Sequence, residues 1–295
     1  MAFLALIPAL MYAIQGASFK QFGLKCDDSK GANALFTTLF MVASAMLSLV
    51  LVFVLDGGTI VPDSILLGAI MGVFFFGIIT FYDKALQLGP LSITSFVFAL
   101  SMIVPIIVFI IFFNEPFKLT YAIGLALAII SIIFINFKKT KSKDITKKAI
   151  DKKWYLYCIL GFIFNAGTLL CGKFHGKFVE NGNPYQYLFV NFVVATILSL
   201  LFYLPKETRE SLKTAEVNGW FIALIAILAI VNVAGNLGSV ILAKYLDSAV
   251  LYPISNGGTV GISVILSVFF FKEKLQARQV VGLIVGLLAI VVLSL

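Results

Sequence analysis

The sequence predicts an all-α membrane protein in which ten transmembrane helices form two inverted five-helix repeats. Of its 295 residues, 61% are apolar and 12% are charged, and 29 are phenylalanines. This composition lies outside the range of soluble globular proteins. Apolar runs of about 20 residues, the length that crosses a bilayer, follow one another along the chain. The second half of the sequence also repeats the first, which points to a duplicated architecture.

The apolar runs leave no stretch between them that is long enough for a soluble domain. The first run lacks the basic start and the small-residue cleavage site of a signal peptide, so we expect it to be a span. The expected localisation is the cell membrane, as a multi-pass integral protein. The ten spans are expected near residues 2–22, 32–55, 64–87, 90–113, 118–137, 154–177, 184–204, 217–243, 248–271 and 276–295.

The repeat is clearest where the fifth and tenth spans begin. Residues 112–128 read FFNEPFKLTYAIGLALA, and residues 270–286 read FFKEKLQARQVVGLIVG. A shift of 158 positions aligns these segments and also aligns Gly77 with Gly235, whereas nearer the start of each half the shift is 153. The expected parts of the chain are a first five-helix repeat at 1–137, a basic linker at 138–153 and a second five-helix repeat at 154–295.

Basic residues set the expected orientation. Residues 138–153 hold eight lysines, as in a cytoplasmic loop under the positive-inside rule. Each of the ten spans moves the chain to the other side of the membrane, so every Lys and Arg can be assigned to one side. The side that holds the linker receives 18 of the 22 basic residues: four before the linker, eight in it and six after it. Both termini are therefore expected outside. Because the net charge of +8 is explained by topology, the expected partner is the lipid bilayer, and no nucleic acid is expected.

An odd number of spans in each repeat inverts the second repeat relative to the first. Inverted repeats recur in secondary transporters, which bind their substrate near the bilayer midplane where the two halves meet. Polar side chains inside the spans are costly unless they face partners or water. They are therefore the candidates for a substrate site.

The first and sixth spans carry polar groups at equivalent positions. Tyr12 and Gln15 lie near the middle of the first span, and Asn165 and Thr168 are their counterparts at a shift of 153. For each residue alone, an interhelical hydrogen bond without a ligand is the alternative. Polar pairs at the same place in both copies favour a lined cavity.

The eighth span carries the most polar face inside the membrane. Asn232, Asn236 and Ser239 are spaced by four and three residues, which places them on one side of a helix. Gly235 and Gly238 lie beside them, so close helix packing is the competing interpretation.

The fourth and ninth spans combine polar residues with helix breakers. The fourth contains Ser95, Ser101 and Pro105, and residues 252–261 of the ninth read YPISNGGTVG. Proline removes a backbone donor, so we expect both spans to be interrupted there, as at transport sites. A kink that only shapes packing is the alternative. The candidates of the ninth span are Tyr252, Ser255, Asn256 and Thr259.

Other features are expected to be structural. The cysteines show no metal-binding spacing, which indicates a packing role. Gly282 and Gly286 form a GxxxG motif that favours packing inside the chain over dimerisation, so the expected state is a monomer or homodimer. Lys20, Lys173 and His175 lie near span ends and are expected to reach the interface. The alternatives are a substrate role for the two lysines and a proton switch at His175.

The doubled five-span unit, Glu115 and Glu273 after the fourth and ninth spans, and the glycine nine residues later resemble the EamA family of the drug/metabolite transporter superfamily. The likeness covers nearly the whole chain. It implies a central cavity formed by spans 1, 3, 4, 6, 8 and 9, and solutes such as amino acids, other metabolites or nucleotide sugars. It implies cytoplasmic termini, against the charge count. It also implies that each glutamate caps the helix that follows it.

Together these features predict a secondary transporter that moves a small neutral or zwitterionic, amino-acid-like metabolite by alternating access. No Asp, Glu or His lies near the centre of a span, so a proton or sodium relay would lack its usual carboxylate, and no cofactor or metal is expected. Two alternatives stay open: a scaffold or receptor that moves no solute, and a proton-coupled drug exporter of the same fold. An enzyme is not expected, because it would need paired acids, metal ligands or an activated nucleophile.

Overall fold

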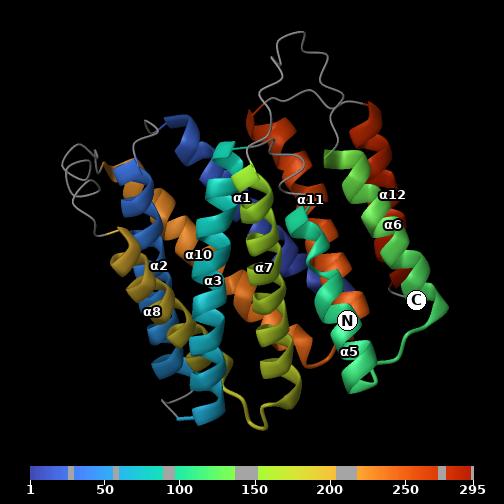
Figure 1. The fold of residues 1–295 in the computed structure, drawn as a ribbon, viewed down its shortest axis with the longest axis horizontal. Helices are drawn as coiled ribbons and strands as arrows, with labels where there is room; N and C mark the ends of the chain where they lie inside the picture. The colour runs from blue at the N-terminus through green and yellow to red at the C-terminus, as the bar shows by residue number, and fades with distance from the viewer. Residues whose placement is uncertain are drawn as a thin grey trace. The chain divides into compact units, whose positions relative to one another are not determined.

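The computed structural model describes residues 1–25, 30–55, 60–88, 97–136, 152–203, 218–271 and 277–293. Every regular element in these ranges is a helix, as the sequence predicted (Figure 1). The elements are the 3₁₀ turn η1 (Ala2–Ala5) and the helices α1 (Leu6–Lys25), α2 (Lys30–Leu55), α3 (Pro62–Leu88), α5 (Ile103–Phe113), α6 (Leu119–Asn136), α7 (Lys152–Phe178), α8 (Pro184–Tyr203), α10 (Gly219–Ala243), α11 (Ser248–Phe271) and α12 (Ala277–Leu293).

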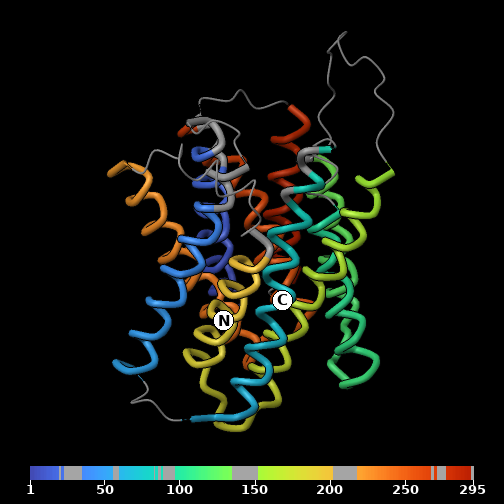
Figure 2. The backbone as a smooth tube through the Cα atoms, turned by 60° about the vertical axis from the view of Figure 1, so that its left-hand side comes forward, coloured from blue at the N-terminus to red at the C-terminus, as the bar shows by residue number. Residues whose placement is uncertain are grey.

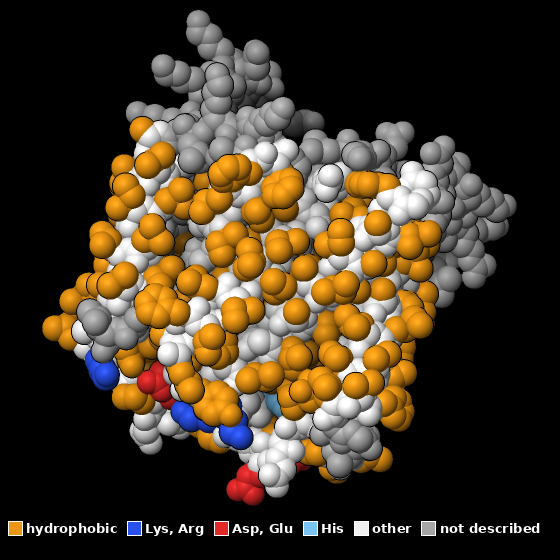
Figure 3. Space-filling model, turned by 180° about the vertical axis from the view of Figure 1, so that it is seen from behind, with side chains coloured by type: hydrophobic (Ala, Val, Ile, Leu, Met, Phe, Trp, Pro, Cys, Tyr) orange, Lys and Arg blue, Asp and Glu red, His pale blue; other side chains and the backbone are white. Residues whose placement is uncertain are grey.

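These helices have the length and surface of membrane spans. Seven are long and apolar enough to cross a bilayer, and three shorter apolar helices, at Val97–Phe113, Leu119–Phe134 and Ala277–Leu293, match the remaining predicted spans. Large apolar side chains face outward, with Phe53 66% and Val54 71% exposed. Figure 3 shows hydrophobic side chains over the visible face and charged ones at its lower edge. The chain is therefore a multi-pass integral membrane protein.

Packing divides the helices into two compact units that differ from the two repeats. Unit 1 comprises residues 1–6, 77–170 and 246–295, and unit 2 comprises residues 7–76 and 171–245. Each unit therefore takes helices from both halves of the sequence. The helices α3 and α7, which can be followed by their colours in Figure 2, each begin in one unit and end in the other.

In unit 2, α2 packs against its repeat counterpart α8. Thr38 and Ser199 share a hydrogen bond of 2.8 Å between their hydroxyl oxygens. Farther along the pair, Leu49 and Phe189 line one groove. Residue numbers therefore rise along α2 while they fall along α8, so the two helices are antiparallel.

In unit 1, α6 packs against its counterpart α12 in the same antiparallel sense. The hydroxyl of Ser131 donates to the carbonyl oxygen of Gly282 at 2.7 Å. Gly124 contacts Leu293, and a Cβ on Gly286 would lie 2.7 Å from the Ser131 hydroxyl oxygen. The GxxxG pair thus packs within the chain. Antiparallel counterparts in both units are what inverted repeats require.

The expected interruption occurs in the fourth span but not in the ninth. Ser101 and Met102 form a turn between the helical residues 97–100 and α5. Pro105 has no N–H to donate to the Ser101 carbonyl, which instead accepts from Val104 at 3.1 Å. By contrast, α11 is continuous through Pro253, so the expected interruption there is wrong. Pro253 lies in the second turn of α11, where its missing N–H removes a single helical hydrogen bond.

Candidate substrate site

Three of the five candidates of unit 2, Gln15, Asn232 and Asn236, meet at the side chain of Asn232, which is fully buried. Its amide nitrogen donates to the Ser44 hydroxyl at 3.2 Å. Its amide oxygen accepts from the side-chain nitrogen of Asn236 at 3.0 Å and from that of Gln15 at 3.5 Å. One asparagine thus joins α10 to both α1 and α2.

A hydroxyl pair extends this group along α1 and α10. The oxygens of Tyr12 and Ser239 are 3.2 Å apart. The helices can approach because a Cβ on Gly235 would lie only 3.0 Å from the Tyr12 ring. We call the whole group the amide cluster, and it consists of Tyr12, Gln15, Ser44, Asn232, Asn236 and Ser239.

Ser44 was not predicted to belong to this group. It lies on α2 among apolar residues, and Ser48 follows it at a spacing of four; both are fully buried. That spacing on an otherwise apolar helix was a usable signal for a polar contact. What it could not reveal was the partner, because Asn232 lies 188 positions away in the sequence.

In unit 1 the candidates Asn165 and Ser101 meet at the interruption of the fourth span. The Asn165 amide nitrogen donates to the Phe98 carbonyl at 3.0 Å and to the Ser101 hydroxyl at 2.6 Å. The Ser101 hydroxyl donates to the same carbonyl at 2.7 Å. We call these three residues the Phe98 cluster. The cluster adds two side-chain donors to a carbonyl that already accepts from the Ser101 N–H at 3.1 Å.

The other candidates of unit 1 do not join this cluster. The Tyr252 hydroxyl donates to the Leu169 carbonyl at 2.6 Å and so ties α11 to α7. Three hydroxyls bond carbonyls of their own helices, and the Asn256 amide nitrogen is buried with no hydrogen-bond partner within the described ranges. Ser95 lies outside the described residues. The hydroxyls that bond their own helices are those of Thr168, Ser255 and Thr259.

Lys173 and His175 are buried rather than interfacial, with exposures of 1% and 2%. The Nε2 atom of His175 lies 2.9 Å from the Ser64 hydroxyl oxygen, and its ring stacks on that of Tyr187 at 4.3 Å between centroids. The expectation that both side chains reach the interface is therefore wrong. The C-terminal end of α7 packs against α3 and α8. Position near a span end does not reveal this packing.

Glu115 caps α11, which is not the next helix in the sequence. Its carboxylate accepts from the backbone N–H of Ser248 at 2.8 Å, at the start of α11, whereas the next helix in sequence is α6. Asn114 adopts a left-handed conformation with φ of 50°, which turns the chain after α5 and brings Glu115 to α11. Glu273 lies outside the described residues.

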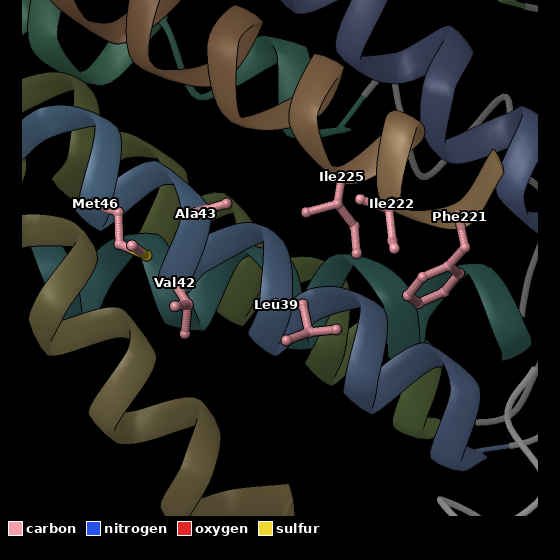
Figure 4. Close-up of a pocket in the computed structure, with 7 residues that line it drawn as sticks. All are labelled: Leu39, Val42, Ala43, Met46, Phe221, Ile222 and Ile225. Atoms are coloured by element: carbon pink, nitrogen blue, oxygen red, sulfur yellow. The ribbon is translucent and has the colours of Figure 1, made fainter. Parts of the chain in front are cut away.

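Two apolar grooves on unit 2 are separate from the polar groups. The larger, about 270 Å³, lies between α2 and α10 and the smaller, about 180 Å³, between α2 and α8. Met46 and Ile222, at the larger groove, are 65% and 58% exposed (Figure 4). Hydrocarbon walls on a lipid-facing surface offer no hydrogen bond to a polar solute. The residues drawn in Figure 4 are Leu39, Val42, Ala43, Met46, Phe221, Ile222 and Ile225.

Each cluster consists of amides, hydroxyls and one backbone carbonyl, that of Asn232 or that of Phe98, with no charged side chain. Within the described ranges, no three His, Cys, Asp or Glu side chains gather into a group that could hold a metal ion. The clusters can therefore bind through hydrogen bonds. They contain no group that would activate a nucleophile or transfer a proton at neutral pH.

Comparisons with known proteins agree with this architecture. A solved structure described only as "Crystal structure of protein" matches with a TM-score of 0.76 and 14% identity, over 100% of this chain and 98% of that one. Among curated proteins, none matches. The sequence model of the EamA-like transporter family matches residues 1–137 and again residues 152–295. The chain belongs to the EamA-like transporter family.

Proposed function

We propose that this membrane transporter carries a small neutral or zwitterionic, amino-acid-like metabolite by alternating access of its two inverted halves. The observation that supports the proposal is an uncharged polar cluster within the spans of each unit. Tyr12 and Gln15 of the amide cluster are the repeat counterparts of Asn165 and Thr168. A lining of amides and hydroxyls favours a solute with hydrogen-bonding groups and little net charge, because a single uncompensated charge is costly at this depth.

The edge of the amide cluster supports contact with a solute. Asn232 and Asn236 are buried, whereas Tyr12, Gln15 and Ser239 are half-buried. In this proposal the buried asparagines hold the half-buried side chains in place, and those side chains contact the solute. A site built on helices in this way positions its contact groups more accurately than a loop does.

Uptake into proteoliposomes tests the proposal. We expect saturable uptake of at least one member of an amino-acid panel, and loss of that uptake in Gln15→Leu. Leu10→Met, on the outer face of the same helix with Leu10 40% exposed, is the matched control and should transport normally. If the folded wild-type protein moves no member of the panel, the scaffold alternative is favoured. If uptake requires an imposed pH gradient, the proton-coupled alternative is favoured.

A further inference from the structure

We infer that Asn191 is a further solute-binding residue of unit 2, and that it binds a solute group in which a hydrogen-bond donor lies beside an acceptor. The inference rests on the proposed function, because it gives Asn191 a role in the transport cycle proposed above. Its starting observation is that the Asn191 amide is buried inside a span without a hydrogen bond.

The Asn191 amide lacks a partner at both ends. Within the described ranges it is the one side-chain amide whose nitrogen and oxygen are both buried without a hydrogen bond. Asn191 lies near the middle of α8 and is 0% exposed, so no water molecule fits beside it in this conformation. Burying an unpaired amide costs stability, and buried polar groups are nearly always hydrogen-bonded. Such an exception points to a partner that reaches the amide in another conformation.

Other polar residues of unit 2 differ from Asn191 in their bonds. Ser199, on the same helix and equally buried, shares a hydrogen bond of 2.8 Å with Thr38. Asn232, which is also fully buried, donates to Ser44 at 3.2 Å. These side chains join α8 to α2 and α10 to α2. Asn191 makes no such bond to the described chain, so its polarity does not hold the helices together.

Asn191 lies where α8 contacts α3. At Gly72 an added Cβ would lie 2.7 Å from the Asn191 carbonyl oxygen. At Gly68, one turn earlier, it would lie 2.5 Å from that of Tyr187, so the two backbones are in close contact. The Tyr187 ring also stacks on that of His175 in α7. Asn191 is therefore on the face of α8 that α3 closes, one helical turn from the contact with α7.

The two helices at this place, α3 and α7, are helices that pass from one unit to the other. Each has one end in unit 1 and the other end in unit 2. A relative movement of the units, as alternating access requires, therefore acts on both helices directly. In the proposed cycle α3 moves away from α8, and this movement uncovers the Asn191 amide. The close contact at Gly72 represents the covered state.

The chemistry of the solute group follows from the amide itself. Its nitrogen donates and its oxygen accepts, and both are without a partner. The ammonium and carboxylate groups of an amino acid lie on one carbon and can pair with both ends of an amide. An amine alone or a carboxylate alone leaves one end unpaired. If water alone served the amide, the affinity for a solute would not depend on Asn191.

Melting temperatures test whether the amide is unsatisfied in the covered state. Asn191→Leu keeps nearly the volume of the side chain and removes the unpaired group. It should raise the melting temperature of the purified protein by about 2–4 °C, whereas Asn232→Leu, which breaks hydrogen bonds, should lower it. An unchanged or lower melting temperature in Asn191→Leu would overturn the inference.

Cysteine labelling tests whether the contact opens. Asn191→Cys is introduced into a variant in which Cys26, Cys158 and Cys171 are replaced by alanine. Ser199→Cys in the same background is the matched control, because Ser199 is equally buried but hydrogen-bonded. In proteoliposomes, a small water-soluble methanethiosulfonate reagent should modify Asn191→Cys and spare Ser199→Cys, and melting temperatures show that both variants fold. Labelling of neither variant, or equal labelling of both, would contradict the opening of α3.

Matched probes test the chemistry of the solute. Each protein amino acid is compared with its amine and its acid, which for leucine are 3-methylbutylamine and 4-methylpentanoate. At millimolar concentration, at least one amino acid should raise the melting temperature of the wild-type protein, because a ligand that binds the folded state stabilises it. Its amine and its acid should not. An amine or acid that stabilises as strongly as its amino acid, or no shift with any amino acid, would refute the inference.

The variant Asn191→Leu assigns this binding to Asn191. It should bind the stabilising amino acid about tenfold more weakly, the loss expected for one hydrogen bond to a charged group. Ile197→Leu, on the same helix with Ile197 51% exposed, is the control and should bind normally. Unchanged affinity in Asn191→Leu would show that the solute does not contact Asn191.

The outcomes also separate this inference from the proposed function. Binding that depends on Asn191 without any flux in proteoliposomes would sink the transport proposal and leave the binding role standing. Flux of an amino acid with unchanged affinity in Asn191→Leu would sink the binding role and leave transport standing.

Discussion

In unit 2 the helices α1 and α10 meet through amides and hydroxyls, and also through the rings of Phe22 and Phe221. In unit 1 the equivalent helices α7 and α3 meet through aromatic rings at the place that corresponds to the hydroxyl pair of unit 2. Ser239, which bonds Tyr12, corresponds at a shift of 158 to Phe81. The Phe81 ring lies 5.3 Å from that of Phe164 and 6.2 Å from that of Tyr157, between centroids. The two contacts occupy the same place in the repeat but have different chemistry.

A glycine is common to both contacts. Gly235 lies against Met11 and Tyr12, and Gly77 lies against Phe164, the repeat counterpart of Met11. Close approach of two helix backbones requires a small residue whatever surrounds it. The side chains around it are not constrained in this way. The glycine at each contact is therefore required by the close approach of the helix backbones. The polar side chains around Gly235 are not required for that approach, so they are free to serve a ligand site.

The largest expected effect comes from filling these glycines. A Cβ on Gly77 would overlap the Phe164 ring, whereas a Cβ on Gly235 would remain 3.0 Å from the nearest atom of Tyr12. We expect Gly77→Ala to destabilise the protein by about 1–3 kcal/mol, as overpacking does, and Gly235→Ala to destabilise it less. Thermal unfolding in detergent measures both. Phe164→Leu should restore part of the loss in Gly77→Ala, and equal losses in the two alanine variants would contradict the difference between the contacts.

An intermediate effect is expected at Asn232. Asn232→Leu removes three side-chain hydrogen bonds, and at about 0.6 kcal/mol for each one inside a membrane the expected loss of stability is about 1–2 kcal/mol. We also expect transport to be lost. Phe74→Leu at the equivalent position is the control, and should have a smaller effect because no hydrogen bond is removed. If the Asn232→Leu variant had the same melting temperature as the wild type, the amide cluster would not stabilise unit 2.

The smallest effect is expected at two helix caps. In unit 2, Asn218 caps its own helix α10, accepting from the Phe221 N–H at 2.9 Å, whereas in unit 1 Glu115 caps α11 from a distant part of the chain. We expect Asn218→Ala and Glu115→Ala each to cost about 1 kcal/mol. Hydrogen exchange should accelerate at the first turn of α10 in one variant and of α11 in the other. Faster exchange in α6 rather than α11 for Glu115→Ala would show that the glutamate caps the following helix after all.

Much of the fold was predictable because its signals are local in sequence. The ten spans follow from apolar runs, and the confirmed break at Ser101 follows from Pro105 four residues later. The same reasoning failed at Pro253, because a proline near a helix start removes only one hydrogen bond. Of the candidate site, the stripe of Asn232, Asn236 and Ser239 was predicted from helical spacing. In the structure all three lie on α10, where Asn236 bonds Asn232 and Ser239 bonds Tyr12.

Sequence by itself determined the helical class, the membrane location and the duplication, because hydropathy and repeat spacing are properties of the linear chain. Only the tertiary structure decided that Ser44 bonds Asn232, that Glu115 caps α11, and that Lys173 and His175 are buried. It also decided that each compact unit draws helices from both repeats. These outcomes depend on which distant segments meet. Which segments meet depends on how the surfaces of whole helices pack against one another, and this cannot be derived from any single stretch of sequence.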